Sequence, residues 1–159
     1  MQQFANVFFI FSAKYLFVAP IIIVGGYFLR RSWPTKKQMI VFALPALVLT
    51  YAVGLVGNHV YVDPRPFVVG HFTPLVPHTP DNGFPSDHTL LVSALAAVGF
   101  YWQRTLGGVL AALALIVAVA RVDVGLHHPI DVIGSIVIAA VTTSLVFVVL
   151  KYVAPKTAV

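Results

Sequence analysis

The feature that most limits the fold of this chain is a series of five long apolar segments. They lie at about residues 4–29, 39–56, 89–102, 106–124 and 129–149. Only 9% of the 159 residues are charged and the mean hydropathy is +0.92, whereas a soluble domain carries roughly 25% charged residues. Because such a chain cannot cover its surface with charge, the sequence predicts an all-α, polytopic membrane bundle of five, or at most six, transmembrane helices. We expect one domain over residues 1–159.

Two of these segments do not define where their helices begin and end. Residues 4–29 are long for a bilayer core of about 30 Å, so they fit either one tilted helix or a short surface helix followed by a span. Residues 89–102 reach a full span only if the helix starts near Ser86. The loop at residues 57–85 is rich in proline, which argues against a further helix there; its prolines are Pro64, Pro66, Pro74, Pro77, Pro80 and Pro85.

The basic residues predict how the bundle is oriented. Seven of the ten lie at one set of helix ends, which the positive-inside rule assigns to the cytoplasm. The N-terminus, the long loop and the 125–128 link then face outward, together with every aspartate and histidine. The charge therefore indicates membrane orientation, and we expect no nucleic-acid partner. The seven residues are Arg30, Arg31, Lys36, Lys37, Arg104, Lys151 and Lys156.

Three polar clusters, at residues 58–66, 84–88 and 121–131, are expected to meet on the outer side. Arg65 and Arg121 offer guanidinium groups, which bind phosphate oxygens in a fork and stay charged. The turn that ends at His88 opens a helix, whose free N–H groups favour an anion, and the Ser86 hydroxyl adds a donor. These residue types favour a phosphate-binding site.

Hydrolysis of a phosphate ester also needs a nucleophile and a group that protonates the leaving oxygen. His127 and His88 fit these two roles. Asp131 lies four residues after His127, about one helical turn away, and can hold the far side of that imidazole. The chain has no cysteine, which excludes a cysteine nucleophile and thiolate metal sites.

The order Arg65-Pro66, then residues 85–88 (Pro-Ser-Asp-His), then Arg121, His127 and Asp131 resembles the type 2 phosphatidic acid phosphatase superfamily. The resemblance covers about residues 58–131. It implies an α-helical membrane phosphatase that needs no metal or other cofactor. It also implies a phosphohistidine intermediate on His127, with His88 as the general acid.

The chain departs from the family signature at three positions. Asn58 stands where the family has lysine, Asp87 replaces a glycine, and Ala120 replaces a serine. The Asp87 form is similar to the bacitracin-resistance branch, which implies hydrolysis of undecaprenyl diphosphate to undecaprenyl phosphate and phosphate in a bacterial cytoplasmic membrane. Asn58 and Asp87 stay candidate substrate contacts. Lys14, in the outward half of the first segment, is a hypothetical substitute for the missing lysine, as a buried ammonium that pairs with the lipid diphosphate.

Other functions remain open at this point. The same site would accept phosphatidic acid or phosphatidylglycerophosphate. His127 and Asp131, with further histidines, could instead form a divalent-metal or haem site, although two neighbouring arginines suit an anion better. The expected partners are a lipid diphosphate and membrane lipid, and the sequence does not determine the oligomeric state.

Overall fold

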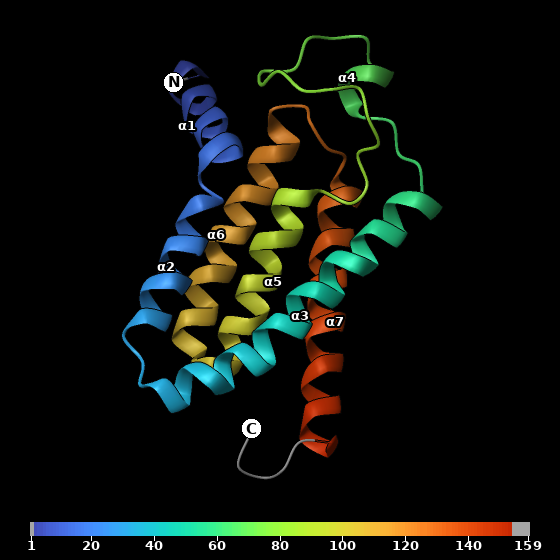
Figure 1. Ribbon diagram of the computed structural model, residues 1–159. Coiled ribbons are helices and arrows are strands. Elements are labelled where there is room, and N and C mark those ends of the chain that lie inside the picture. The colour runs from blue at the N-terminus through green and yellow to red at the C-terminus, as the bar shows by residue number, and fades with distance from the viewer. Residues whose placement is uncertain (1, 154–159) are drawn as a thin grey trace.

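Seven helices make up most of the chain in the computed structural model, which describes residues 2–153 (Figure 1). They are α1 (Gln2–Tyr15), α2 (Val18–Leu29), α3 (Trp33–Val60), α4 (Pro66–Val69), α5 (Asp87–Trp102), α6 (Arg104–Asp123) and α7 (Pro129–Val153). Within residues 2–153 extended pairing is confined to an isolated bridge between Pro64 and Asn82. The predicted all-α class is confirmed.

Helix α5 is the centre of the bundle and packs against α2, α3, α6 and α7. Its 16 residues extend about 24 Å at 1.5 Å per residue, which is shorter than a bilayer core of about 30 Å. Small residues let α6 approach closely: a Cβ on Gly107 would lie 2.5 Å from the backbone nitrogen of Phe100. The helix that carries the second polar cluster is therefore shielded by other helices.

The first apolar segment is two helices, so it is not one continuous tilted span. Helices α1 and α2 are bent by 51° at a short break. By length and composition α3, α6 and α7 can cross a membrane, and the bent pair adds a fourth span if it counts as one. Helix α4 has four residues and is too short to span. The chain is an integral membrane protein, while the number of five spans stays a prediction.

The bundle has one basic end and one end that carries the connecting loops. The α2–α3 turn, the α5–α6 turn and the last turn of α7 share the basic end, at the bottom of Figure 1. The described residues of the basic set are Arg30, Arg31, Lys36, Lys37, Arg104 and Lys151; Lys156 lies outside the described residues. The N-terminal helix, the proline-rich loop and the α6–α7 link lie at the opposite end.

The proline-rich loop is fastened to the bundle by its own polar groups. The Asn82 side chain donates to the carbonyls of Asn58 (2.8 Å) and Tyr61 (2.9 Å) and accepts from the Asp63 amide (2.8 Å). The Leu75 amide donates to the carbonyl of Val124 in the α6–α7 link (3.2 Å). These bonds close the loop over the ends of α5, α6 and α7.

Candidate active site

His127 lies at the centre of the polar groups, in the link between α6 and α7, and only 2% of it is exposed. Its Nε2 is 3.2 Å from Nη1 of Arg65 and 3.0 Å from Nη2 of Arg121. Guanidinium nitrogens only donate, so Nε2 must carry the lone pair and Nδ1 the proton. Nδ1–H donates to the Gly83 carbonyl (3.0 Å) and lies 3.3 Å from Oδ2 of Asp131. The surroundings thus select the tautomer in which Nε2 is a free nucleophile.

The two arginines are almost completely buried, with 5% of Arg65 and 4% of Arg121 exposed. Nε of Arg65 donates to Asp81 at 2.6 Å, and its Nη1 donates to the Leu126 carbonyl at 3.0 Å. Arg121 donates to the Ala13 carbonyl at 3.4 Å, and its Nε has no hydrogen-bond partner within the described residues. Among the described residues Asp81 is the carboxylate hydrogen-bonded to either arginine, and it is exposed, so the guanidinium N–H groups beside His127 suit an anion.

Asp131, fully buried in the first turn of α7, stands behind the imidazole. Its Oδ2 accepts from the His128 amide at 2.9 Å as well as facing His127. Its Oδ1 has no hydrogen-bond partner among the residues described. The spacing of four residues predicted this contact, and the structure shows it.

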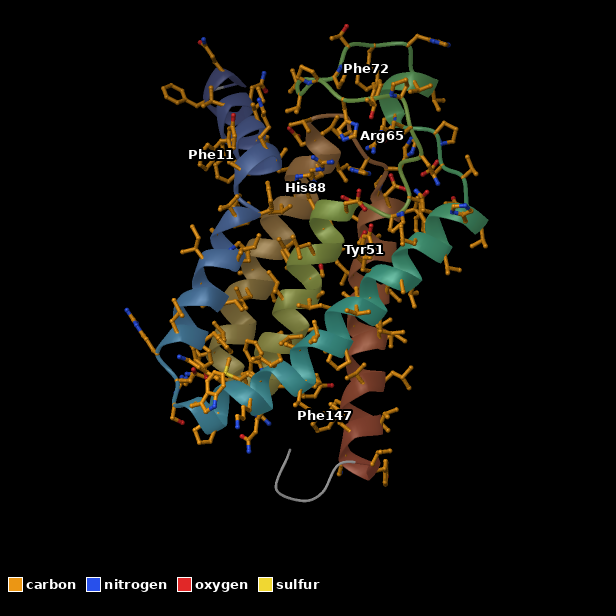
Figure 2. The ribbon with its side chains drawn as sticks, viewed as in Figure 1. Phe11, Tyr51, Arg65, Phe72, His88 and Phe147 are labelled. Atoms are coloured by element: carbon orange, nitrogen blue, oxygen red, sulfur yellow. The ribbon has the colours of Figure 1, made fainter. Side chains whose placement is uncertain are left out.

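The start of α5 borders the same cluster. Ser86 is fully buried, its amide donates to the Asp131 carbonyl (3.4 Å), and its carbonyl accepts from Ser135 Oγ (3.0 Å). His88 follows in the first turn, where its ring packs edge-on against Phe17 with centroids 4.5 Å apart. Its electrostatic neighbours include Arg121, His127 and Arg65, and Figure 2 shows His88 and Arg65 at the same end of the bundle. His88 thus faces the cluster without a hydrogen bond to it.

Three predicted contacts lie outside the cluster around His127. Lys14 is exposed, with its ammonium 5.4 Å from the centroid of the Tyr15 ring, and is not the buried ammonium we expected. Asn58 donates to the Phe84 carbonyl (2.8 Å), so it fastens the loop. Asp87 is exposed at the beginning of α5. The structure therefore brings together Arg65, Arg121, His127 and Asp131, with Ser86 and His88 at the edge.

The sequence analysis missed the loop groups that complete the site. Asp81 pairs with Arg65, and Gly83 supplies the carbonyl opposite Nδ1 of His127. Asp63 pairs with His128 at 3.0 Å between Oδ2 and Nδ1. An Asn-Gly dipeptide at residues 82–83 signals a turn, but nothing local shows which side chain its carbonyl will face.

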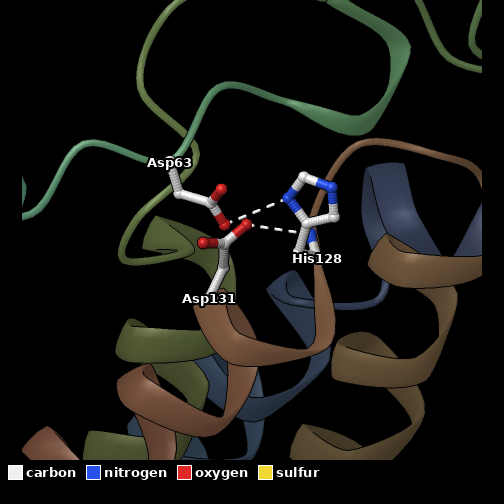
Figure 3. Close-up of side chains that lie close together, drawn as sticks. All are labelled: Asp63, His128 and Asp131. Atoms are coloured by element: carbon white, nitrogen blue, oxygen red, sulfur yellow. Dashed lines mark hydrogen bonds and ion pairs between the residues drawn. The ribbon is translucent and has the colours of Figure 1, made fainter. Parts of the chain in front are cut away.

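A carboxylate-rich group lies next to His127. Ligand atoms of Asp63, His128 and Asp131 lie within 4.8 Å of one another, as Figure 3 shows. Among the described residues, these three could hold a metal ion. The metal hypothesis also included His127, which is not one of the three. The free nitrogen of His127 faces two cations instead.

Burial and charge set the protonation of the groups outside the helices. Burial lowers the pKa of His127, and the charges of Arg121 and Arg65 lower it further, although Asp131 opposes them. Burial would raise the pKa of Asp81, but the hydrogen bond and charge of Arg65 hold it below its ordinary value. His127 is consequently neutral at pH 7.

A groove of about 740 Å³ runs from this site between α3 and α5. Its polar end is lined by Asn58, Arg65, Asp81, Asn82 and Asp87, and its apolar end by residues that include Leu47, Val48, Leu55, Leu90 and Leu91. A charged mouth that leads into an apolar channel between helices suits an amphipathic ligand, with its anionic group at Arg65 and its chain among the leucines.

The sequence is similar to those of two proteins from Bacillus species. The chain is 33% identical over 141 residues to an undecaprenyl-diphosphatase BcrC of Bacillus subtilis, which covers 87% of this chain and 71% of that protein. It is 29% identical over 148 residues to a bacitracin transport permease protein BcrC of Bacillus licheniformis, covering 92% of this chain and 70% of that protein.

Solved structures share the fold. The crystal structure of Aquifex aeolicus LpxE superposes with a TM-score of 0.71 at 21% identity, over 91% of this chain and 86% of that one. A transmembrane phosphatidylglycerolphosphate phosphatase of the PAP2 type from Bacillus subtilis gives a TM-score of 0.62 at 20% identity, over 98% and 81%. Residues 39–154 match the family model described as the PAP2 superfamily. With that match over most of its length, the chain belongs to the PAP2 superfamily.

Proposed function

We propose that this protein is a phosphatase of the cytoplasmic membrane that hydrolyses undecaprenyl diphosphate to undecaprenyl phosphate and phosphate. The observation that carries the proposal is the neutral Nε2 of His127 between two buried guanidinium groups. The substrate is supported by the relative named undecaprenyl-diphosphatase, which is 33% identical to this chain.

In the first step Nε2 of His127 attacks the terminal phosphorus. The bond between that phosphorus and the bridging oxygen breaks, and undecaprenyl phosphate leaves. Arg65 and Arg121 take the phosphoryl oxygens in place of Nε2 and stabilise the charge of the transition state. Asp131 keeps Nδ1–H in place and balances the positive charge that the phosphorylated ring acquires. His88 donates a proton to the leaving oxygen.

In the second step water attacks the phosphohistidine. His88, now neutral, takes a proton from this water while the phosphorus–nitrogen bond breaks. Inorganic phosphate leaves and His127 returns to its neutral form. The unpartnered N–H at Nε of Arg121 is a spare donor that a phosphoryl oxygen can use in both steps.

The groove between α3 and α5 supports a lipid substrate. Arg65 and Asp87 lie at its mouth, and Leu47 and Leu91 lie further along. An isoprenoid chain that enters sideways from the bilayer would occupy the apolar part while its diphosphate reaches His127.

We further propose that the site faces the extracytoplasmic side. The described basic residues at the α2–α3 and α5–α6 turns and at the end of α7 lie at the other end of the bundle, where the positive-inside rule places the cytoplasm. Labelling a single cysteine introduced at His71 in intact cells with a membrane-impermeant reagent tests this orientation, because His71 lies exposed in the loop.

Phosphate release from purified protein in detergent with EDTA tests the activity. We expect turnover of undecaprenyl diphosphate that exceeds turnover of phosphatidic acid and phosphatidylglycerophosphate, and loss of release in His127→Ala. Faster turnover of either monoester would identify that lipid as the substrate and would not affect the proposal for the catalytic residues. If the His127→Ala variant still released phosphate, His127 would not be the nucleophile.

A further inference from the structure

A second imidazole–carboxylate pair lies against Asp131 and has no part in the steps above. Oδ2 of Asp63 is 3.0 Å from Nδ1 of His128. In Figure 3 the carboxylates of Asp63 and Asp131 point toward each other, with the His128 ring beside Asp63. Asp131 is fully buried, whereas the other two are half-buried. Asp131 is thus flanked by two histidines: it contacts the ring of His127 itself, and the ring of His128 contacts the neighbouring Asp63.

Two carboxylates this close do not both stay ionised without a nearby positive charge, because like charges disfavour ionisation. Burial raises the pKa of Asp63, the charge of Asp131 raises it further, and His128 opposes both effects. The His128 ring, 3.0 Å from Oδ2 of Asp63, is therefore the group that offsets the charge of this carboxylate next to Asp131.

We propose that Asp63 and His128 are positioning residues: the hydrogen bond of the His128 ring to Asp63 keeps that carboxylate from competing with Asp131, so that Asp131 stays directed at Nδ1–H of His127. This inference rests on the proposed function, since it assigns a role around the proposed nucleophile. The backbone supports it: the His128 amide also donates to Oδ2 of Asp131 at 2.9 Å. The main-chain amide of His128 would therefore hold Oδ2 of Asp131, and the His128 ring would offset the charge of Asp63.

The arrangement predicts a rescue. In His128→Ala the Asp63 carboxylate loses its partner and competes with Asp131 for hydrogen-bond donors, so Asp131 supports Nδ1–H of His127 less well. Adding Asp63→Asn removes the competing carboxylate and returns Asp131 to its contact with His127. A pair that served only to pack the loop could show this reversal in Tm, but it would leave kcat near the wild-type value, so kcat is the measurement that separates the two roles.

The experiment measures kcat and KM for phosphate release in EDTA for the two single variants and the double variant. We expect His128→Ala to lower kcat by about tenfold or more with KM changed less than about threefold, since Asp131 contacts His127 rather than the phosphate. Asp63→Asn is expected to lower kcat by less than about threefold, and the double variant to come within about threefold of Asp63→Asn. His59→Ala and Asp123→Asn remove an exposed imidazole and an exposed carboxylate at the same end and serve as matched controls.

A double variant no better than His128→Ala would overturn the proposal, as would an Asp63→Asn variant as slow as His128→Ala. Loss of wild-type activity in EDTA would also overturn it, because the three residues would then be ligands of a metal. If the wild type releases no phosphate from any lipid, the proposed function fails, and thermal unfolding in detergent decides on the pair. His128→Ala should then lower Tm and Asp63→Asn should restore at least half of the loss, and no restoration would reject the pair.

Discussion

Gly83 is the position where one added methyl group should disturb the catalytic groups most directly. Its carbonyl accepts from Nδ1 of His127 at 3.0 Å. A Cβ at this residue would lie 2.9 Å from Oδ2 of Asp131 and 3.0 Å from the Asp63 carbonyl oxygen. One neighbour is backbone and the other is held by the His128 amide, so neither can rotate away. Gly83→Ala must therefore move the loop, or Asp131, by several tenths of an ångström.

The size of the effect follows from that displacement. Overpacking a close-packed site costs about 1–3 kcal/mol, which lowers Tm by roughly 2–12 °C for a chain of this length, at about 2–4 °C per kcal/mol. A misplacement of about 1 Å at a catalytic group costs about 100-fold in rate, so a shift of about half that size should lower kcat by about tenfold. KM should change little, because the Gly83 side of the ring is turned away from the arginines.

The assay is phosphate release from the lipid diphosphate together with thermal unfolding in the same detergent. Gly25→Ala is the matched control, because a Cβ there meets nothing within 4 Å. An alanine inside a helix is also favoured over glycine by about 1 kcal/mol, so this control should keep its kcat and lose no stability. A Gly83→Ala protein with the kcat and Tm of the wild type would refute the close approach of residue 83 to Asp131.

Further outcomes follow from the same geometry. Asp131→Asn should lower kcat by about 10³–10⁴-fold, as loss of the orienting carboxylate does in comparable triads, and a loss below tenfold in a phosphate-release assay would reject its role. The pKa of His127 is below its ordinary value of 6.5. The nucleophile should therefore stay neutral as the pH falls to 6.5, and activity should be lost only below that pH. A decrease of kcat/KM that begins above pH 6.5 on the acid side would contradict this. The unfolded chain binds this proton first, so the unfolding free energy should also decrease as the pH drops below 6.5, which denaturant titration at several pH values measures. Leu91→Trp should raise KM for undecaprenyl diphosphate by about tenfold through narrowing of the groove and leave a small aryl phosphate nearly unaffected, whereas Leu115→Trp, exposed on α6, should change neither; equal effects of the two tryptophans would argue against the groove.

Much of the architecture could be predicted from local pattern. A chain with so few charges needs every backbone group bonded within its own segment, and helices satisfy this requirement. The apolar segments therefore predicted α6 and α7 to within about four residues and α3 to within about six, and the motif at residues 85–88 predicted where α5 begins. The contact of His127 with Asp131 was predicted from their spacing of four residues, although His127 lies in the link before α7.

Lys14 and the first segment show where local pattern was insufficient. The break between α1 and α2 has no proline or glycine within it, so the sequence alone left a continuous helix open. The face of α1 that is buried carries Ser12 and Ala13, and Lys14 points to the other side. Which face packs depends on α6, and only the assembled bundle defines it.

The amino-acid sequence by itself determined that this protein lies in a membrane and where most of its helices are. It also indicated four groups expected around a phosphate: Arg65, Arg121, His127 and Asp131. The tertiary structure decided what surrounds them. Asp81 reaches Arg65, Gly83 reaches His127 and Asp63 reaches His128 only because a loop with six prolines folds back over three helix ends. The physical reason is range: helical periodicity acts over one or two turns, whereas Gly83 and His127 are 44 residues apart and meet only through the path of that loop.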